Sequence, residues 1–322
     1  MKKILITGGC GFIGVNLIDC LKKNNLADRI VVLDNESLGK HSYLEEFDNI
    51  EFYHGDIRDK DIVHDVLKGM DAVVHLAADT RVLDSIADPV KNFDVNVVGT
   101  LNVLNAVREN KVPLLVNAST GGAILGEVPS PVHEGMAPEP LSPYGASKLS
   151  VEGYCSAYTR SYGIRASSLR FSNVYGPRSF HKGSVVAAFF KNILAGESLN
   201  VYGDGSQVRD YVFVEDICTA IVNALKLEIV SFYQLGTGIP TTVNQLIDFM
   251  REVVEDDSKI HVKYHDFRAG EIHTTYCDIS KAHKNLNYSP SMDLKQGLKI
   301  TWNWFKSSYQ KKYKQWIGSP ET

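Results

Sequence analysis

The chain of 322 residues is 44% hydrophobic and 22% charged, and its formal net charge is −4. This length is enough for a large core, or for one main domain with a smaller partner, and the composition is that of an ordinary globular protein. The weakly acidic balance gives no electrostatic footprint for nucleic acid or an anionic membrane. The apolar start ends at Thr7, too early for a signal peptide, and no stretch reaches the roughly 18 apolar residues of a membrane span. We therefore expect a cytoplasmic protein with neither nucleic acid nor membrane as a partner.

The cysteines argue against a disulfide-rich or zinc-stabilised protein. Five are spread along the chain and none forms a C-x-x-C pair: Cys10, Cys20, Cys155, Cys218 and Cys277. An odd, dispersed set fits neither a disulfide framework nor a zinc ribbon. We expect buried, reduced thiols and no metal site.

Short apolar runs alternate with amphipathic stretches through the first half of the chain. Strands are predicted at 4–7, 30–34, 51–55, 72–77, 114–118 and 165–171. Helical spacing follows the first strand and recurs at 60–68, 93–107 and 144–162. This repetition predicts an α/β protein with a doubly wound parallel (Rossmann) sheet, because right-handed crossovers place helices on both faces.

The regular alternation of predicted strands and helices ends after Ser172, where loops rich in Gly, Pro and Ser separate shorter elements. We interpret this region as a smaller α/β domain that binds the substrate and whose chain weaves in and out of the first domain. Residues 1–172 and 208–236 are predicted to form the dinucleotide-binding domain, and residues 173–207 and 237–322 the smaller one. The last stretch, 306–322, is expected to be a solvated helix or a frayed tail.

A glycine-rich turn lies between the first predicted strand and the first helix. Gly8, Gly11 and Gly14 give the spacing G-x-x-G-x-x-G, with Phe12 and Ile13 inside it. Glycine permits the tight turn and lets backbone N–H groups approach a pyrophosphate, which the helix N-terminus also attracts. A glycine turn alone is weak evidence, but one that follows a strand and opens a helix predicts a dinucleotide site.

The second predicted strand ends in Asp34. An acid at this position is expected to bind the adenosine ribose hydroxyls and to repel a 2′-phosphate, and the adjacent Asn35 supplies no cation for one. NAD is therefore favoured over NADP as the cofactor, although a strand-end cap is the alternative for Asp34. Weaker candidates for cofactor contacts lie at the ends of the third and fourth strands: Asp56, Ile57, Leu76, Ala77 and Ala78.

Tyr144 and Lys148 form a Y-x-x-x-K pair at the start of a predicted helix. Residues four apart share one helix face, and a nearby ammonium favours phenolate, so Tyr144 is predicted to be a general base with a lowered pKa. Lys148 can also hold the nicotinamide ribose. Ser119 and Thr120 follow the fifth strand, where a hydroxyl can share a hydrogen bond with the tyrosine and the substrate; turn capping is the alternative.

These motifs, T-G-G-x-G-F-I-G, H-L-A-A and Y-x-x-x-K, stand together with a block from Tyr202-Gly203-Asp204-Gly205 to Arg209-Asp210-Tyr211. In this combination the chain resembles the extended short-chain dehydrogenase/reductase family over nearly its whole length. The resemblance is closest to the NAD-dependent nucleotide-sugar enzymes of the UDP-glucose (UDP-galactose) 4-epimerase group. It implies NAD as cofactor and a nucleotide sugar such as a UDP-hexose as substrate. It also implies a homodimer, in which the apolar faces of the helices at 93–107 and 144–162 can pair; packing of these faces on the sheet is the alternative.

The resemblance also implies roles for single residues. Tyr144 is the base, Lys148 is its activator, and Asn96 lies behind the nicotinamide. The residues expected to contact the sugar nucleotide are Asn173, Arg178, Arg209, Arg268 and Glu271. Among them, Arg209 and Arg268 clamp the diphosphate, because guanidinium forks match phosphate oxygens. A surface ion pair is the alternative for either arginine.

The reaction that the resemblance implies is 4-epimerisation through a transient 4-keto sugar. Tyr144 takes the proton of the C4 hydroxyl while hydride passes to NAD, and hydride returns to the other face after the sugar turns. Family members that dehydrate or decarboxylate usually carry an acid after the Ser/Thr pair, but here Gly121-Gly122 follows. A 4,6-dehydratase or a UDP-glucuronate decarboxylase or 4-epimerase stays an alternative, because Glu127 and Glu134 lie further along. A non-catalytic NAD sensor is disfavoured by the Tyr–Lys pair.

Two local departures bear on the sugar. Gly121 stands where many 4-epimerases have a serine, so the hydroxyl role is assigned to Thr120, and Leu125 replaces the usual tyrosine of V-Y-G. We therefore hypothesise a changed sugar preference. In a later Gly- and Pro-containing loop, His181 and Lys182 either meet an anionic or polar sugar substituent, such as a uronate, or are solvated.

Overall fold

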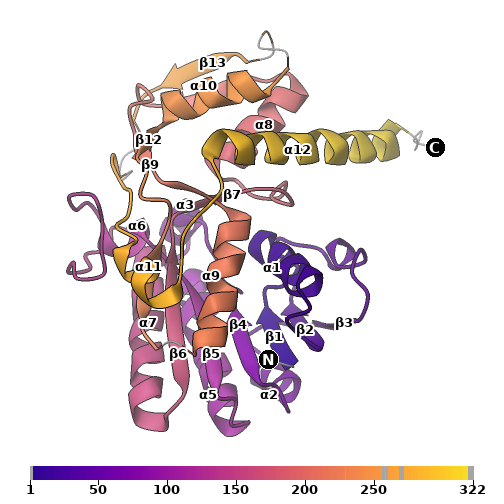
Figure 1. The fold of residues 1–322 in the computed structure, drawn as a ribbon, viewed down its shortest axis with the longest axis vertical. Helices are drawn as coiled ribbons and strands as arrows, with labels where there is room; N and C mark the ends of the chain where they lie inside the picture. Colours follow the sequence, from indigo (N-terminus) through magenta and orange to yellow (C-terminus); the bar gives the residue numbers. More distant parts are fainter. Residues whose placement is uncertain (1–2, 229, 256–257, 259, 268–271, 318–322) are drawn as a thin grey trace.

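Seven parallel strands form the centre of the protein (Figure 1). The computed structural model describes residues 3–228, 230–255, 258, 260–267 and 272–317, with side chains up to residue 309. The strand order is β11-β6-β5-β4-β1-β2-β3, and every neighbouring pair is parallel. The strands are β1 (Lys3–Thr7), β2 (Arg29–Asp34), β3 (Ile50–His54), β4 (Ala72–His75), β5 (Leu114–Thr120), β6 (Arg165–Phe171) and β11 (Phe232–Leu235). The predicted doubly wound α/β sheet is confirmed.

Helices cover both faces of this sheet, because successive strand residues point to opposite sides. Ile4 and Ile6 of β1 share a core with α1 and α9, whereas Leu5 shares the core of the other face with α2, α5 and α7. Burial on both faces explains why the strands are continuous apolar runs in the sequence. The helices are α1 (Phe12–Lys23), α2 (Lys60–Val66), α5 (Gly99–Glu109), α7 (Pro143–Tyr162) and α9 (Val214–Leu227).

The predicted helix over 93–107 is helical throughout, but it begins earlier, at Pro89, and contains a π-helical turn. The chain forms α4 (Pro89–Phe93), then a π-helical turn (Asp94–Val98), and then α5. Asp88 starts α4 early, because its carboxylate accepts a hydrogen bond from the Lys91 N–H and a proline fills the first turn. π-helical turns often occur at functional sites, and this one contains Asn96.

A third core lies beyond one end of the sheet strands and is built by the second half of the chain (Figure 1). Phe190, Leu246, Met250 and Phe305 are buried in it. Its main elements are α8 (Val185–Ala195), β8 (Leu199–Tyr202), α10 (Val243–Val253), β13 (Val262–His265) and α12 (Leu294–Ile317). Two short pairs connect it to the sheet: β7 (Asn173–Tyr175) with β10 (Tyr211–Phe213), and β9 (Val208–Arg209) with β12 (Thr241–Thr242). The domain boundaries stay a prediction.

Two helices near the end of the chain pack on different cores. α11 (Ser280–Leu286) returns to the central sheet, where Ala282 and Leu286 join the core of α1 and α9. α12 begins well before the predicted terminal helix, because Leu298 and Trp302 pack in the third core. Within the described residues, we find no helix with both the length and the apolar character needed to cross a membrane.

Candidate active site

A cleft of about 1110 Å³ opens at the carboxyl ends of the central strands. Its walls include residues that follow β1, β2, β4 and β5, and, from the second half of the chain, the loop between β7 and α8. Ligands of doubly wound sheets bind at this edge. The volume exceeds the roughly 300–1000 Å³ of a site for one drug-sized ligand, so a dinucleotide and a second ligand can share it.

The glycine-rich turn forms a cradle in this cleft. Gly8 has a φ of +70°, and a Cβ on it would lie 2.7 Å from the backbone nitrogen of Ala77. A Cβ on Gly14 would lie 2.6 Å from the Cα of Gly9. α1 starts at Phe12 with no side-chain cap and no acidic residue in its first turn, so its first N–H groups stay available to an anion. The cradle therefore fits a pyrophosphate, as the spacing predicts.

Asp34 ends β2 with a buried carboxylate that lines the same cleft. One oxygen accepts a hydrogen bond from the Cys10 N–H (3.0 Å) and the other from the Glu36 N–H (2.8 Å). Burial raises the pKa of this carboxyl, although both backbone hydrogen bonds lower it. Each oxygen keeps a lone pair for a further donor. The residue therefore fits the ribose-binding role that its position predicts.

The rim next to Asp34 is formed by Asn35 and Asp56. The Asn35 amide donates to Asp56 (2.8 Å), and Arg58 binds the same carboxylate through two N–H groups, each at 2.9 Å. Hydrogen bonding by Arg58 holds the pKa of Asp56 well below its usual range. Arg58 also lines the cleft, a cation that the sequence analysis did not consider. The other predicted cofactor contacts of this wall line the cleft too: Ile57, Leu76, Ala77 and Ala78.

α7 presents the Tyr–Lys pair. Ser142 caps the helix by accepting a hydrogen bond from the Gly145 N–H (3.2 Å), which starts α7 just before Tyr144. Burial in the cleft wall raises the pKa of Tyr144 to about 12, while a hydrogen bond with Thr120 lowers it and the charge of Asp79 raises it. The direction is opposite to the predicted one, because burial favours the neutral phenol more than its neighbours favour phenolate.

Lys148 lies one turn further along the same face of α7. Its ammonium donates to the backbone oxygen of Ala118 in β5 (2.9 Å). Burial lowers its pKa to about 8. The ammonium therefore carries its charge at neutral pH, and it has protons left for a second acceptor in the cleft.

A buried ion pair lies behind these residues. Glu152, a further turn along α7, accepts hydrogen bonds from Arg170 of β6 (2.9 and 2.7 Å) and from the Ser119 hydroxyl (2.6 Å). The Ser119 proton is thus directed at Glu152, although the residue lines the cleft as predicted. Sequence reasoning missed Glu152 and Arg170. Two sequence features could have indicated this ion pair: a carboxylate four residues after Lys148, and an arginine within a predicted buried strand.

Asn96 connects the loop after β4 to α7. Its side-chain amide accepts a hydrogen bond from the backbone N–H of Asp79 (2.7 Å). It donates to the backbone oxygen of Asp79 (2.9 Å) and to the Ser147 hydroxyl (3.0 Å). The adjoining helix α3 (Val82–Ala87) contributes Ser85, whose hydroxyl accepts a hydrogen bond from the Tyr144 N–H (3.1 Å). Asn96 is buried behind this wall, where it positions the segment that faces Tyr144.

Of the predicted substrate contacts, Asn173 and Arg209 line the cleft. Arg209 also donates to the backbone oxygens of Val208 (2.9 Å) and His273 (3.1 Å). Arg268 and Glu271 lie outside the described residues.

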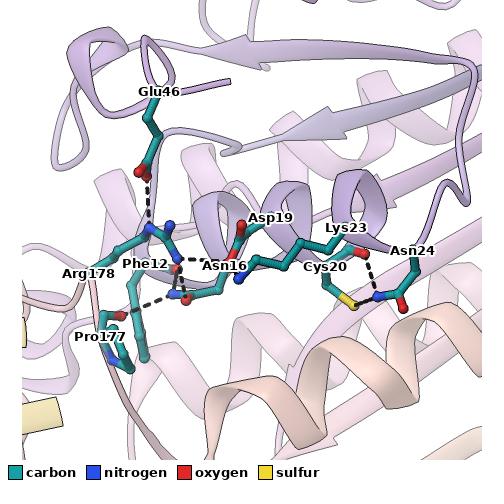
Figure 2. A network of polar contacts seen from close by, with 9 residues as sticks. All are labelled: Phe12, Asn16, Asp19, Cys20, Lys23, Asn24, Glu46, Pro177 and Arg178. Carbon is teal, nitrogen blue, oxygen red and sulfur yellow. Dashed lines mark hydrogen bonds and ion pairs between the residues drawn. The ribbon is translucent and has the colours of Figure 1, made fainter. Parts of the chain in front are cut away.

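Arg178 differs from the other predicted substrate contacts, because the structure does not bring it into the cleft. Figure 2 shows its guanidinium directed at α1 and at Glu46. It donates to Glu46 (2.9 Å), and to Asn16 and Asp19 (3.3 Å each). Asn16 in turn donates to the backbone oxygen of Pro177 (3.0 Å). These bonds tie the loop after β7 to α1, so Arg178 anchors one wall of the cleft.

The glycine cradle and Asp34 fit a dinucleotide, and Tyr144 faces the rest of the same cleft, where it can exchange a proton with a second ligand. This arrangement defines a Rossmann-type enzyme of the extended short-chain dehydrogenase class. Residues 4–236 match the model of the NAD dependent epimerase/dehydratase family. The chain belongs to that family, and its cofactor is NAD.

Individual relatives agree over nearly the full length. The chain is 41% identical over 312 residues to a putative UDP-glucose 4-epimerase of Methanocaldococcus jannaschii, a match covering 95% of this chain and 99% of that protein. A solved UDP-glucose 4-epimerase of Thermotoga maritima with UDP-glucose is 36% identical, with a TM-score of 0.90 and coverage of 96% and 100%. A Thermus thermophilus UDP-glucose 4-epimerase in complex with NAD is also 36% identical, with a TM-score of 0.89. The chain is thus an enzyme of a family of nucleotide-sugar epimerases and dehydratases.

Replacing Asp34 with alanine is expected to weaken NAD binding and to relax the rejection of NADP. The variant loses the carboxylate oxygens that fit the ribose hydroxyls, together with a negative charge that would repel a 2′-phosphate. Hydrogen bonds to a charged group contribute roughly 1.5–3 kcal/mol, so we expect a rise of about 10- to 150-fold in the Kd for NAD. Calorimetric titration with both cofactors measures the change, with Asp28→Ala on the surface as control. NADP binding as weak as in the wild type would contradict this account of cofactor choice.

Proposed function

We propose that the protein epimerises a UDP-hexose at C4 through a transient 4-keto sugar, with Tyr144 as base, assisted by Lys148 and Thr120. The position of Tyr144 carries the proposal: it lines the cleft together with Thr120, whose side chain lowers its pKa, and it lies one turn from Lys148. Gly121 and Gly122 follow Thr120, and neither offers an acid that could protonate a departing hydroxyl.

The residues of the chain divide the proton chemistry among them. NAD, when bound, supplies the hydride acceptor and donor. Tyr144 takes the proton from the C4 hydroxyl and returns it to the same oxygen after the 4-keto sugar has turned its other face to the cofactor. Thr120 donates a hydrogen bond where negative charge develops. Because burial raises the pKa of Tyr144 to about 12, phenolate needs a positive charge nearby, and Lys148 is the cation that α7 provides.

Proton NMR of the purified protein with UDP-glucose, UDP-N-acetylglucosamine and UDP-glucuronate, each without added NAD, tests this proposal. The expected result is a galacto-configured anomeric signal that grows to a fixed ratio, because epimerisation regenerates its cofactor at each turnover. Tight NAD binding with no turnover on any nucleotide sugar would instead favour a non-catalytic sensor.

A 4,6-dehydratase is the second candidate, and one observation favours it. Asp79 lines the cleft and its charge acts on Tyr144. The carboxylates considered from the sequence do not line the cleft: Glu127 is exposed, and Glu134 accepts a hydrogen bond from the Gln234 N–H (2.8 Å). In the same NMR experiment, dehydration would convert the C6 hydroxymethyl signal into a methyl signal. Loss of that product in Asp79→Asn would identify the acid.

The proposed assembly is a homodimer. The short helices α3 and α4, which pack beside α7, expose Leu83, Ile86, Val90 and Phe93, each more than half exposed. Contiguous exposed apolar side chains mark interaction sites, and a second copy of the chain supplies a matching surface. We expect Phe93→Glu to convert a dimer into a monomer in light scattering, and Leu227→Glu, at an exposed apolar position on α9, to leave it dimeric. A monomeric wild type would remove the proposal.

A cytoplasmic location belongs to the same proposal. All five cysteines are free and none is exposed. Burial raises the pKa of several of these thiols, among them Cys155 to about 12. Unpaired, unreactive thiols are typical of a reducing compartment.

A further inference from the structure

Lys182 places a positive charge in the cleft that no part of the proposed mechanism uses. It belongs to the loop between β7 and α8, and it lines the cleft. Within the ranges that the structure describes, its ammonium has no hydrogen-bond acceptor and no carboxylate partner. Burial lowers its pKa, and the positive charge of Arg81 lowers it further. A shielded cation without a partner costs free energy, which an anionic ligand can offset.

Arg81 approaches the same part of the cleft from the loop after β4. It lines the cleft, and it forms an ion pair with Asp84 at 3.5 Å. Both of these side chains are more than half exposed, so the pair contributes little and does not neutralise the region. Two cations from segments a hundred residues apart are thus held close enough to repel each other.

The loop that carries Lys182 is anchored on both sides. Upstream, Arg178 and Pro177 are bound to α1, as Figure 2 shows. At Lys182 itself, the backbone N–H donates to the backbone oxygen of Ser179 (2.9 Å). The backbone oxygen of Lys182 accepts a hydrogen bond from the Lys191 ammonium (2.8 Å). The backbone of Lys182 is therefore held in place before any ligand arrives, which lowers the cost of binding one.

The position of Arg81 identifies the part of the ligand that these cations meet. Arg81 is the N-cap of α3, and its oxygen accepts a hydrogen bond from the Ser85 N–H (3.0 Å). Ser85 in turn accepts the hydrogen bond of the Tyr144 N–H. Arg81 is therefore one helical turn from the residue that touches the proposed base. The glycine cradle, which fits a pyrophosphate, lies on a different element. The anion that Lys182 and Arg81 meet thus belongs to the sugar end.

We propose that Lys182 and Arg81 bind a carboxylate carried by the hexose, so that the preferred substrate is a nucleotide hexuronate. This inference rests on the proposed function and narrows its substrate class. Ammonium and guanidinium groups form charge-assisted hydrogen bonds to carboxylate from two sides. A neutral hexose leaves Lys182 without an anionic partner and is therefore the poorer substrate.

The test compares UDP-glucuronate with UDP-glucose in the wild type, Lys182→Gln, Arg81→Gln and the surface control Lys60→Gln. Epimerisation is followed by NMR, and binding of each nucleotide sugar by calorimetry. We expect either cleft variant to lose about 10- to 100-fold in kcat/KM for UDP-glucuronate, the range of a charge-assisted hydrogen bond, and less than about threefold for UDP-glucose. Lys182→Arg should recover part of the loss.

Two results would overturn the inference. Equal losses on both sugars would place the anion at the diphosphate, and a loss of bound NAD would place it on the cofactor. The calorimetric binding measurements separate failure of this inference from failure of the proposed function. If neither sugar turns over but UDP-glucuronate binds more tightly than UDP-glucose only while Lys182 is present, the carboxylate site stands and the proposed reaction fails.

Discussion

Replacing Tyr144 with phenylalanine is expected to reduce turnover by about 10³-fold or more, since a positioned acid–base group contributes roughly 10²–10⁴-fold. The substitution removes only the phenolic oxygen, and the ring keeps its place in the cleft wall. NAD should therefore stay bound, because the glycine cradle and Asp34 are untouched. Rates come from the NMR assay, and the NAD content comes from the cofactor released on denaturation.

Two further variants make the Tyr144 result specific. Tyr154→Phe removes a hydroxyl from an exposed tyrosine of the same helix and should leave the rate unchanged. Thr120→Val removes the hydroxyl that lowers the pKa of Tyr144 and should cost less than loss of the base itself. A Tyr144→Phe enzyme within about threefold of the wild-type rate, a small change on the general acid–base scale, would assign the base elsewhere.

Breaking the Glu152–Arg170 pair is expected to lower the free energy of unfolding by about 3–5 kcal/mol, because a buried charge loses its partner. The two side chains are only 7% and 4% exposed, and two of their hydrogen bonds are 2.9 and 2.7 Å long. Arg170→Met leaves the Glu152 carboxylate buried, with the Ser119 hydroxyl as a remaining donor. Denaturation by guanidinium chloride, read by circular dichroism, measures the loss.

The matched control is the exposed pair Arg29–Glu51, with side chains 38% and 44% exposed. Arg29→Met should cost only about 0–1 kcal/mol, since solvent already screens that pair. A Glu152→Met/Arg170→Met double variant should lose much less than the sum of the two single variants, because no unpaired charge is left buried. A small loss for Arg170→Met alone would mean that water reaches Glu152 and that the pair contributes little.

The strands and helices whose apolar residues recur at a short, regular spacing were predictable from the sequence. β1 and β2 are apolar runs that end at Thr7 and Asp34, and both continue directly into the cleft. The π-helical turn that contains Asn96 was not predictable from apolar spacing. The Asp88 cap that starts α4 and the hydrogen bonds from Asn96 to the Asp79 backbone leave the apolar periodicity of the helix unchanged, so this periodicity predicts neither of them.

Arg178 and Lys182 show, within the cleft region, that the sequence does not reveal which side chains line the site. Both lie in one loop and both are cations, so the sequence treats them alike. In the structure Arg178 turns away to α1 and Glu46, whereas Lys182 lines the cleft. Which cation faces a ligand depends on the acidic residues that fold against the loop, and these come from the first fifty residues of the chain.

The sequence by itself determined the doubly wound sheet, the glycine cradle and the Tyr–Lys spacing, because the patterns that predict them repeat within short segments and right-handed crossovers limit how such segments assemble. Only the tertiary structure decided the pKa values in the cleft and which charged side chains lie next to each other there. The pKa of Tyr144 is raised by burial that the Y-x-x-x-K spacing does not encode. The Glu152–Arg170 pair and the Arg81–Lys182 approach join residues that only folding brings together. Electrostatic effects of this kind depend on distance and solvent exclusion, both of which are set by long-range packing.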